Sequence, residues 1–176
     1  MRKDAVRSTV VSVVLVGVVG CGVVTTSPGR AASGKIFAQK LVEEALPKHS
    51  EVTGLEISAI TNGGCKTIAA TDPKDLGEKC DKDELQPLQT GEPFVDQESD
   101  GFDVTLPLHD ENGKIIAVVG LDFKTTSGQT KESVVKQGKE IVIEMESQVH
   151  SKDKLFQTAR TLSVGNSKKV AEVRGK

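Results

Sequence analysis

The sequence predicts an α+β domain in which helices pack on an antiparallel sheet. Two hairpins indicate the sheet, because Asn62-Gly63-Gly64 and Asn112-Gly113 are turn signals flanked by alternating apolar residues. Apolar residues at helical spacing precede the first hairpin and follow the second, over residues 32–48 and 130–156. The chain has 176 residues, which leaves room for one such domain after an N-terminal export segment.

The composition is that of an ordinary globular chain, with 36% apolar and 27% charged residues. Aromatic residues make up only 3%, and the chain has no Trp and no Tyr, which argues against nucleic-acid stacking platforms and aromatic cages. The formal net charge is -2, so there is no electrostatic reason to bind DNA or anionic lipid. No nucleic-acid partner is therefore expected.

The first twenty residues have the pattern of a secretory signal. A short basic opening, residues 1–7, precedes an apolar run over residues 8–20, which is shorter than the ~20 residues that span a bilayer. Val18-Val19-Gly20-Cys21 resembles a bacterial lipobox, which predicts cleavage before Cys21 and lipidation of its thiol. The alternative is a plain signal peptide followed by an incidental cysteine.

Residues 21–34 are small and turn-forming, which predicts a flexible tether between the lipid and the domain. The expected location is the cell envelope. In a Gram-negative cell the protein would lie on the periplasmic side, and Gly22 favours the outer membrane. In a Gram-positive cell it would be extracellular.

Cys65 and Cys80 remain after Cys21, in a compartment that permits disulfides. We expect a disulfide between them, which would close a loop of about fifteen residues. The alternatives are two free thiols, a zinc pair or a catalytic cysteine. A metal site would need more ligands at short spacing, and the three histidines are scattered along the chain.

Three helices are expected. The first covers residues 32–48, with Ser33 as its N-cap and Pro47 near its end. A short second helix begins after Asp81 as the cap and extends through Leu88, and a long third helix covers residues 130–156.

The strands expected before the second hairpin are Leu55–Thr61, Cys65–Thr71 and Glu92–Gln97. The tail, residues 161–176, is polar with a basic end and should fray.

The second hairpin has a register that follows from a two-residue type I′ turn at Asn112-Gly113. Glu111 then pairs with Lys114, and one face becomes uniformly apolar. On the other face Thr105 pairs with Gly120, and Asp103 with Asp122. Facing carboxylates repel, so these two line a pocket with a compensating group, or they are simply solvated. Gly120 leaves space over the sheet.

Three successive segments resemble a Cache domain, the extracellular PAS-like sensor module of bacterial chemoreceptors and sensor kinases. They are residues 70–80 (ATDPKDLGEKC), 88–95 (LQTGEPFV) and 106–124 (LPLHDENGKIIAVVGLDFK). The resemblance implies a PAS-like five-stranded antiparallel sheet with a long N-terminal helix and a C-terminal helix over residues 35–160. It also implies a small-molecule pocket, in which Asp122 matches the strand aspartate that contacts the ligand amine in amino-acid-binding members.

The Tyr and Trp that accompany this aspartate in amino-acid binders are absent from the chain. Residues 96–107 resemble a calcium loop, but Pro107 stands where the bidentate Glu is needed. A Cys65–His109 dyad has no further support in the sequence. Neither an enzymatic activity nor a metal or cofactor is expected.

The expected function is therefore that of a lipid-anchored sensor-type domain for a small polar solute. Its ligand-binding residues would be Asp122, Asp103, Thr105 and Gly120. A separate sensor kinase or chemoreceptor would carry the signal. The alternative is an envelope protein-protein interaction module with a vestigial pocket.

Overall fold

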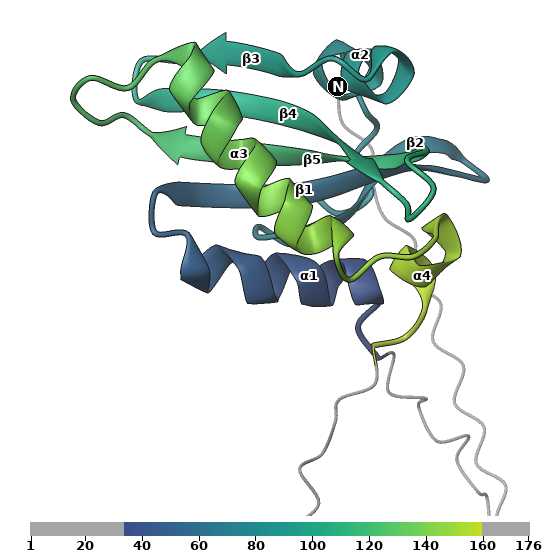
Figure 1. Cartoon of the computed structure of the whole chain (residues 1–176). Coiled ribbons are helices and arrows are strands. Elements are labelled where there is room, and N and C mark those ends of the chain that lie inside the picture. Colours follow the sequence, from purple (N-terminus) through teal and green to yellow (C-terminus); the bar gives the residue numbers. More distant parts are fainter. Residues whose placement is uncertain (1–33, 160–176) are drawn as a thin grey trace, which may run out of the picture. The chain divides into compact units, whose positions relative to one another are not determined.

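The structure is a computed structural model that describes residues 34–159 (Figure 1). The sheet is formed by β1 (Val52–Thr61), β2 (Gly64–Ala70), β3 (Phe94–Gln97), β4 (Gly101–His109) and β5 (Ile115–Lys124). The helices are α1 (Phe37–Ala45), the 3-10 turn η1 (Leu46–Lys48), α2 (Lys82–Thr90), α3 (Lys131–Glu146) and α4 (Lys152–Phe156). The predicted export signal, Cys21, nearly all of the tether and the polar tail lie outside the described residues.

The five strands form one antiparallel sheet in the order β2-β1-β5-β4-β3. The predicted fold class, an α+β domain with a PAS-like five-stranded antiparallel sheet, is confirmed. Within residues 34–159, none of the helices is both long and apolar enough to cross a bilayer.

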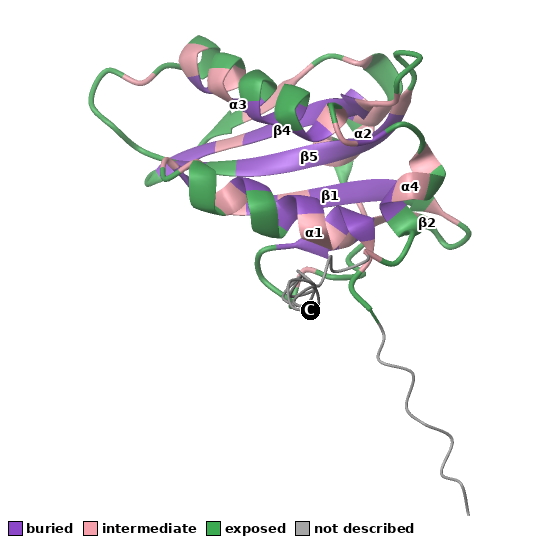
Figure 2. Ribbon diagram, turned by 60° about the horizontal axis from the view of Figure 1, so that its bottom comes forward, coloured by how far each residue is buried: buried purple, intermediate pink, exposed green. Residues whose placement is uncertain are grey.

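One face of the sheet is covered by α1 and α3 and forms the hydrophobic core (Figures 1 and 2). The largest side chains in it are fully buried: Leu41, Ile57, Leu106, Leu108, Leu121, Phe123, Ile141, Met145 and Leu155. Helix α3 approaches β4 and β5 closely at Gly138, where an added Cβ would lie 2.8 Å from Leu106 Cδ1 and 3.1 Å from Leu121 Cδ1. This tight packing fixes which strand residues face inward.

The second face has two halves. Beside α2 it is apolar and closed, and Ile116 and Val118 are 5% and 0% exposed. Toward the other end of β5 it carries carboxylates and is bordered by the segment of residues 71–81. The functional question concerns this acidic half.

The predicted strand register of the second hairpin is confirmed from Phe102–Phe123 through Leu108–Ala117, including Asp103–Asp122 and Thr105–Gly120. The turn differs, and the expected Glu111–Lys114 pair is not formed. Instead, Asp110 Oδ1 accepts hydrogen bonds from the backbone N–H groups of Asn112 and Lys114 at 2.9 and 3.0 Å. These bonds close a wider turn and shift the last pair to His109–Ile115.

Two helices differ in length from the expectation. Helix α1 begins only at Phe37, because Ile36 has extended backbone and pairs with Thr158 near the other end of the described chain. The expected helix over residues 130–156 is two helices. It ends at Glu146, where the Ser147 hydroxyl donates a hydrogen bond to the Glu144 carbonyl at 2.6 Å, and the chain turns to bury Val149.

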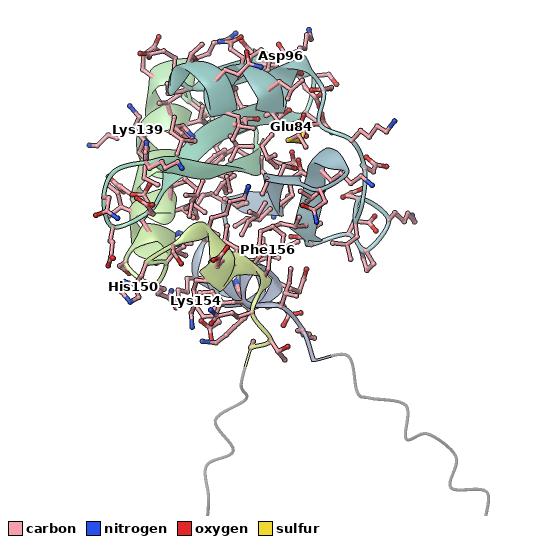
Figure 3. All side chains as sticks on the ribbon, turned by 90° about the vertical axis from the view of Figure 1, so that its right-hand side faces the viewer. Glu84, Asp96, Lys139, His150, Lys154 and Phe156 are labelled. Atoms are coloured by element: carbon pink, nitrogen blue, oxygen red, sulfur yellow. A yellow bond between two sulfur atoms is a disulfide. The ribbon has the colours of Figure 1, made fainter. Side chains whose placement is uncertain are left out.

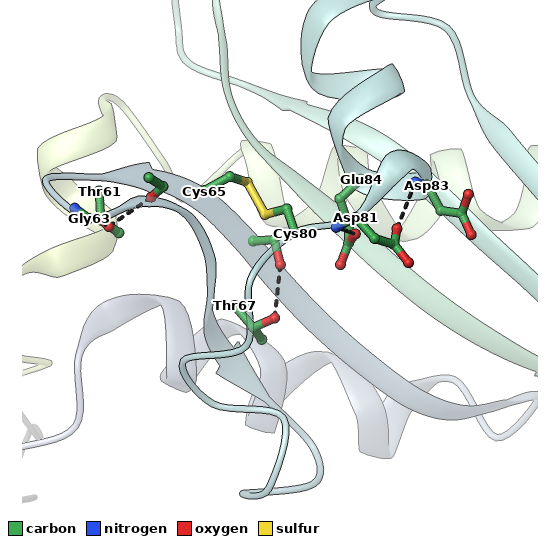
Figure 4. The surroundings of a disulfide bond; sticks show 10 residues. Thr61, Gly63, Cys65, Thr67, Cys80, Asp81, Asp83 and Glu84 are labelled. Carbon is green, nitrogen blue, oxygen red and sulfur yellow. Dashed lines mark hydrogen bonds between the residues drawn. A yellow bond between two sulfur atoms is a disulfide. The ribbon is translucent and has the colours of Figure 1, made fainter.

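The predicted disulfide between Cys65 and Cys80 is formed (Figure 4). It fixes the segment before α2 to the outer edge of β2, where Thr67 N–H donates to the Glu78 carbonyl at 3.0 Å. The predicted cap at Asp81 is also formed: its Oδ1 accepts from Asp83 N–H at 2.7 Å, and Glu84 accepts from Asp81 N–H at 2.8 Å. The disulfide and the capping box together hold the end of the segment of residues 71–81, which borders the acidic half of the second face.

Removing the disulfide with Cys65→Ser and Cys80→Ser together should lower the free energy of unfolding by about 3 kcal/mol, because the closed loop no longer restricts the unfolded chain. Urea denaturation measures this change. Reductant should shift the wild-type midpoint to that of the double variant and leave the double variant unchanged. If the wild-type chain has the same urea midpoint with and without reductant, the disulfide has no structural role.

Candidate functional site

Three aspartates from neighbouring strands stand side by side on the second face of the sheet. Asp96 of β3 pairs with Asp103 of β4, and Asp103 pairs with Asp122 of β5. On the far side of Asp122 the partner is Gly54 of β1. The row of carboxylates therefore ends against a residue without a side chain.

Glycine stands opposite a carboxylate at two positions of the β1–β5 pairing, Gly54–Asp122 and Glu56–Gly120. A Cβ added to Gly54 would collide with the Asp122 carboxylate, and one added to Gly120 would lie 2.9 Å from Glu56 Cγ. Asp122 therefore lies over Gly54, and Glu56 lies over Gly120. The space predicted above Gly120 exists, and the side chain of Glu56 occupies it.

These residues line a cavity of about 410 Å³, which we call the acidic cleft. Its lining consists of Thr53, Gly54, Leu55, Glu56, Thr71, Asp72, Asp75, Asp103, Gly120 and Asp122. The lining includes five carboxylates and no Lys, Arg or His. An adjoining cavity of about 320 Å³ shares Thr53, Asp103 and Asp122, so Asp103 and Asp122 stand where two lobes meet.

Burial and mutual repulsion raise the proton affinity of the acids in the cleft. Burial is the main cause that raises the pKa of Glu56 to about 7, followed by the charges of Glu84 and Asp75. Burial, then the charge of Asp122, raises the pKa of Asp103 to about 6. Burial also raises the pKa of Asp122. No cationic side chain of the described chain lines the cleft, so partial protonation relieves the repulsion at neutral pH.

Of the four predicted ligand-binding residues, Asp103, Gly120 and Asp122 line the cleft together. Thr105 is only 3% exposed and is not part of the lining. Glu56 was not predicted as a residue of the site, because the pairing of β1 with β5 joins segments that lie far apart in the sequence. Alternation within β1 puts Glu56 on the same face as Gly54, but nothing local aligns it with Gly120.

One alternative considered from the sequence is also decided by the geometry. Cys65 is bonded to Cys80, so it forms no dyad with His109. His109 is held instead by Glu146, whose Oε1 lies 2.7 Å from His109 Nδ1. Among residues 34–159, no three His, Cys, Asp or Glu side chains converge closely enough to hold a metal ion.

No family model and no curated protein matches the sequence. Solved structures with a similar arrangement include the GAF domain of a two-component sensor histidine kinase from Bacillus halodurans. It is 10% identical, with a TM-score of 0.46 over 62% of this chain and 91% of that chain. A type II free methionine-R-sulfoxide reductase from Thermoplasma acidophilum is 12% identical, with a TM-score of 0.44 over 65% and 92%.

The E. coli DcuS sensor domain is 20% identical, with a TM-score of 0.38 over 58% of this chain and 71% of that chain. At these identities and TM-scores, the activities of the neighbours are not transferred to this chain. The site is interpreted from its own residues.

The raised pKa values predict a pH-dependent stability. A carboxyl that binds its proton more tightly in the folded chain stabilises the fold below its unfolded pKa and loses this contribution as pH rises through its folded pKa. For Glu56 this interval is from 4.5 to about 7. The melting temperature should therefore fall between pH 5 and pH 8, with a contribution from Glu56 on the order of 1–2 kcal/mol after allowance for solvent screening.

Glu56→Gln should flatten this pH profile, which differential scanning calorimetry measures. The matched control is Glu140→Gln, at an exposed position on α3. Its profile should keep the wild-type slope. An unchanged slope in Glu56→Gln would show that the carboxyl does not carry the effect.

Proposed function

We propose that this chain is a sensor-type, ligand-binding domain for a small organic cation, held in the acidic cleft. The observation that carries the proposal is the lining itself, with five carboxylates and no basic side chain. A volume of about 410 Å³ suits a small molecule, since such sites commonly measure roughly 300–1,000 Å³. The polar solute expected from the sequence is thereby narrowed to one of positive charge.

An ammonium group suits this cleft for an electrostatic reason. Asp103 and Asp122 face each other, and their charges are costly beside one another in a partly buried place. A cation between them would replace the repulsion with two charge-assisted hydrogen bonds, which are roughly twice as strong as neutral ones. Binding would also favour the ionised form of both carboxyls.

Glu56 supplies a third carboxylate, next to Asp122 on the neighbouring strand. Because it lies over Gly120, it reaches the cleft from the β1 side. The adjoining lobe is lined by Glu98 and Asp100 besides the shared pair of aspartates, against the one lysine Lys124. Its lining is therefore also acidic on balance, with room for a second ammonium at some distance from the first. A short diamine fits this arrangement of charge better than a single small ion.

The remainder of the proposal concerns the anchor and the partner. We propose that Cys21 carries lipid and tethers the domain at the cell envelope, on the periplasmic or extracellular side. The resemblance of three segments to Cache domains supports a role with a separate sensor kinase or chemoreceptor. An interaction module with a vestigial cleft is the alternative.

The cleft predicts that 1,4-diaminobutane binds and that 1,4-butanediol, of equal length and without charge, does not. Affinity should fall about tenfold or more from pH 8 to pH 5.5, because protons compete for Glu56 and Asp103 through their pKa values of about 7 and about 6. Isothermal titration calorimetry with the full chain gives both results.

Asp122→Asn keeps the shape of the side chain and removes its charge, and it should weaken diamine binding by at least about tenfold. Asp153→Asn on α4 is the matched control, because Asp153 is exposed and outside the cleft. If the diol binds as well as the diamine, or if Asp122→Asn binds normally, the cation proposal is wrong. Absence of any diamine binding would favour the interaction module.

The anchor has an independent test. In a bacterial host, metabolic labelling with a palmitate analogue should label the wild-type chain and not Cys21→Ser, and the variant should leave the membrane fraction. Cys65→Ser with Cys80→Ser controls for other cysteines and should remain labelled. An unlabelled wild-type chain would exclude lipidation and leave the cleft proposal unaffected.

A further inference from the structure

A second candidate site lies at the other end of the sheet, where β4 meets the end of α3. The last residue of β4, His109, is held by the last residue of α3, Glu146. Glu146 Oε1 accepts a hydrogen bond from His109 backbone N–H at 2.7 Å and lies 2.7 Å from His109 Nδ1. Both the backbone and the imidazole ring of His109 are thus fixed by one carboxylate.

This contact determines the chemistry of the imidazole ring. A carboxylate oxygen accepts hydrogen bonds, so Nδ1 of His109 carries the proton that it donates to Glu146. In the neutral ring, Nε2 is then left as an acceptor. Nε2 takes part in no hydrogen bond among the described residues.

The ring lines a cavity of about 390 Å³, which we call the His109 cavity. Its apolar lining is formed by Pro93, Leu106, Pro107, Val142 and Ile143, and its polar lining by Glu92, His109, Lys139 and Glu146. The side chain of Ile143, on α3, is 62% exposed, which is a high exposure for a large apolar residue. A ligand in the cavity would cover it and gain from its burial.

With His109 neutral, the charged groups around the His109 cavity are Glu92, Lys139 and Glu146, with a net charge of -1. Glu146 is engaged by His109, and Glu92 opposes the single ammonium of Lys139. Neither Glu92 nor Lys139 forms a salt bridge in the described part of the chain. The Glu146 carboxylate is already met by two hydrogen bonds from His109, and most of the remaining lining is apolar. Such a site favours an uncharged ligand, because burial of a further ion beside apolar groups is costly.

We propose that the His109 cavity binds a small, uncharged, apolar molecule that carries one hydroxyl group. A hydroxyl both donates and accepts, so it can donate to His109 Nε2 and accept from Lys139 Nζ. The rest of the ligand packs on the apolar lining, with Ile143 at the rim. The volume is sufficient for a substituted phenol or an alcohol of similar size.

The His109 cavity is independent of the acidic cleft. The two cavities share no lining residue, and their chemistry is opposite, since one is acidic and the other largely apolar. Figure 3 shows Lys139, which lines the His109 cavity, on α3. The proposal therefore stands whether or not the acidic cleft binds a cation.

The test uses two probes of nearly equal size, 4-methylphenol and 4-methylanisole, of which only the first has a hydroxyl. The His ring resonances of the full chain are followed by ¹H–¹³C NMR, and His150→Gln and His49→Gln assign the resonances of the other two histidines. The phenol should shift the His109 resonances and leave those of His150 in place. The anisole should bind at least about tenfold more weakly, because it cannot donate to Nε2.

Ile143→Ser tests the apolar contact without a large effect on folding, because the side chain is mostly exposed in the free protein. It should weaken phenol binding by about threefold or more. Lys136→Ser, also exposed on α3 and outside the cavity, is the control and should bind as the wild type. Equal affinity for both probes, unshifted His109 resonances, or wild-type affinity in Ile143→Ser would each overturn the proposal.

Discussion

The acidic cleft depends on the register of β5 with its two neighbours. Asp122 meets Gly54 on one side and Asp103 on the other, and two residues along β5 Gly120 meets Glu56. A slip by one residue would turn these carboxylates onto the face that packs on α1 and α3. That face is closed by side chains such as Leu121, which is 0% exposed, and by the close approach of α3 at Gly138. Hydrophobic packing on one face therefore places the charges on the other.

The features that were predicted correctly from the sequence depend on residues that lie close together in the chain. The two strands of the β4–β5 hairpin are close in sequence and alternate regularly, so the Asp103–Asp122 pair was predictable; the irregularity between Leu108 and His109 keeps this register although the turn is wider than expected. The disulfide was predictable from the cysteine count together with the expected compartment. Glu56 was not, because its partner Gly120 lies on a strand that a long intervening chain separates from β1. A register of this kind is set by tertiary packing and has no local signal.

The errors have similar physical causes. The apolar spacing of residues 130–156 continues through Ser147, but burial of Val149 and Leu155 against the rest of the domain requires the chain to turn there. At the β4–β5 turn, the Asp110 carboxylate competes for backbone N–H groups and widens a turn that Asn112-Gly113 alone would make tighter. In the first place a tertiary contact, and in the second a side-chain hydrogen bond, outweighs the local sequence pattern on which the prediction was based.

The raised proton affinity of the cleft and the proposed binding of a cation there have one origin. Burial of Glu56 and Asp103 makes their charged forms costly, so the apo domain holds protons that it would lose in the unfolded state. Asp72 and Asp75 add further negative charge, and the disulfide together with the capped start of α2 ties the end of the segment that carries them to β2. Because this link opposes opening of the cleft, the repulsion favours the binding of protons or, as proposed, of a cation. A rigid acidic cleft therefore has a reason to bind positive charge that a flexible acidic loop lacks.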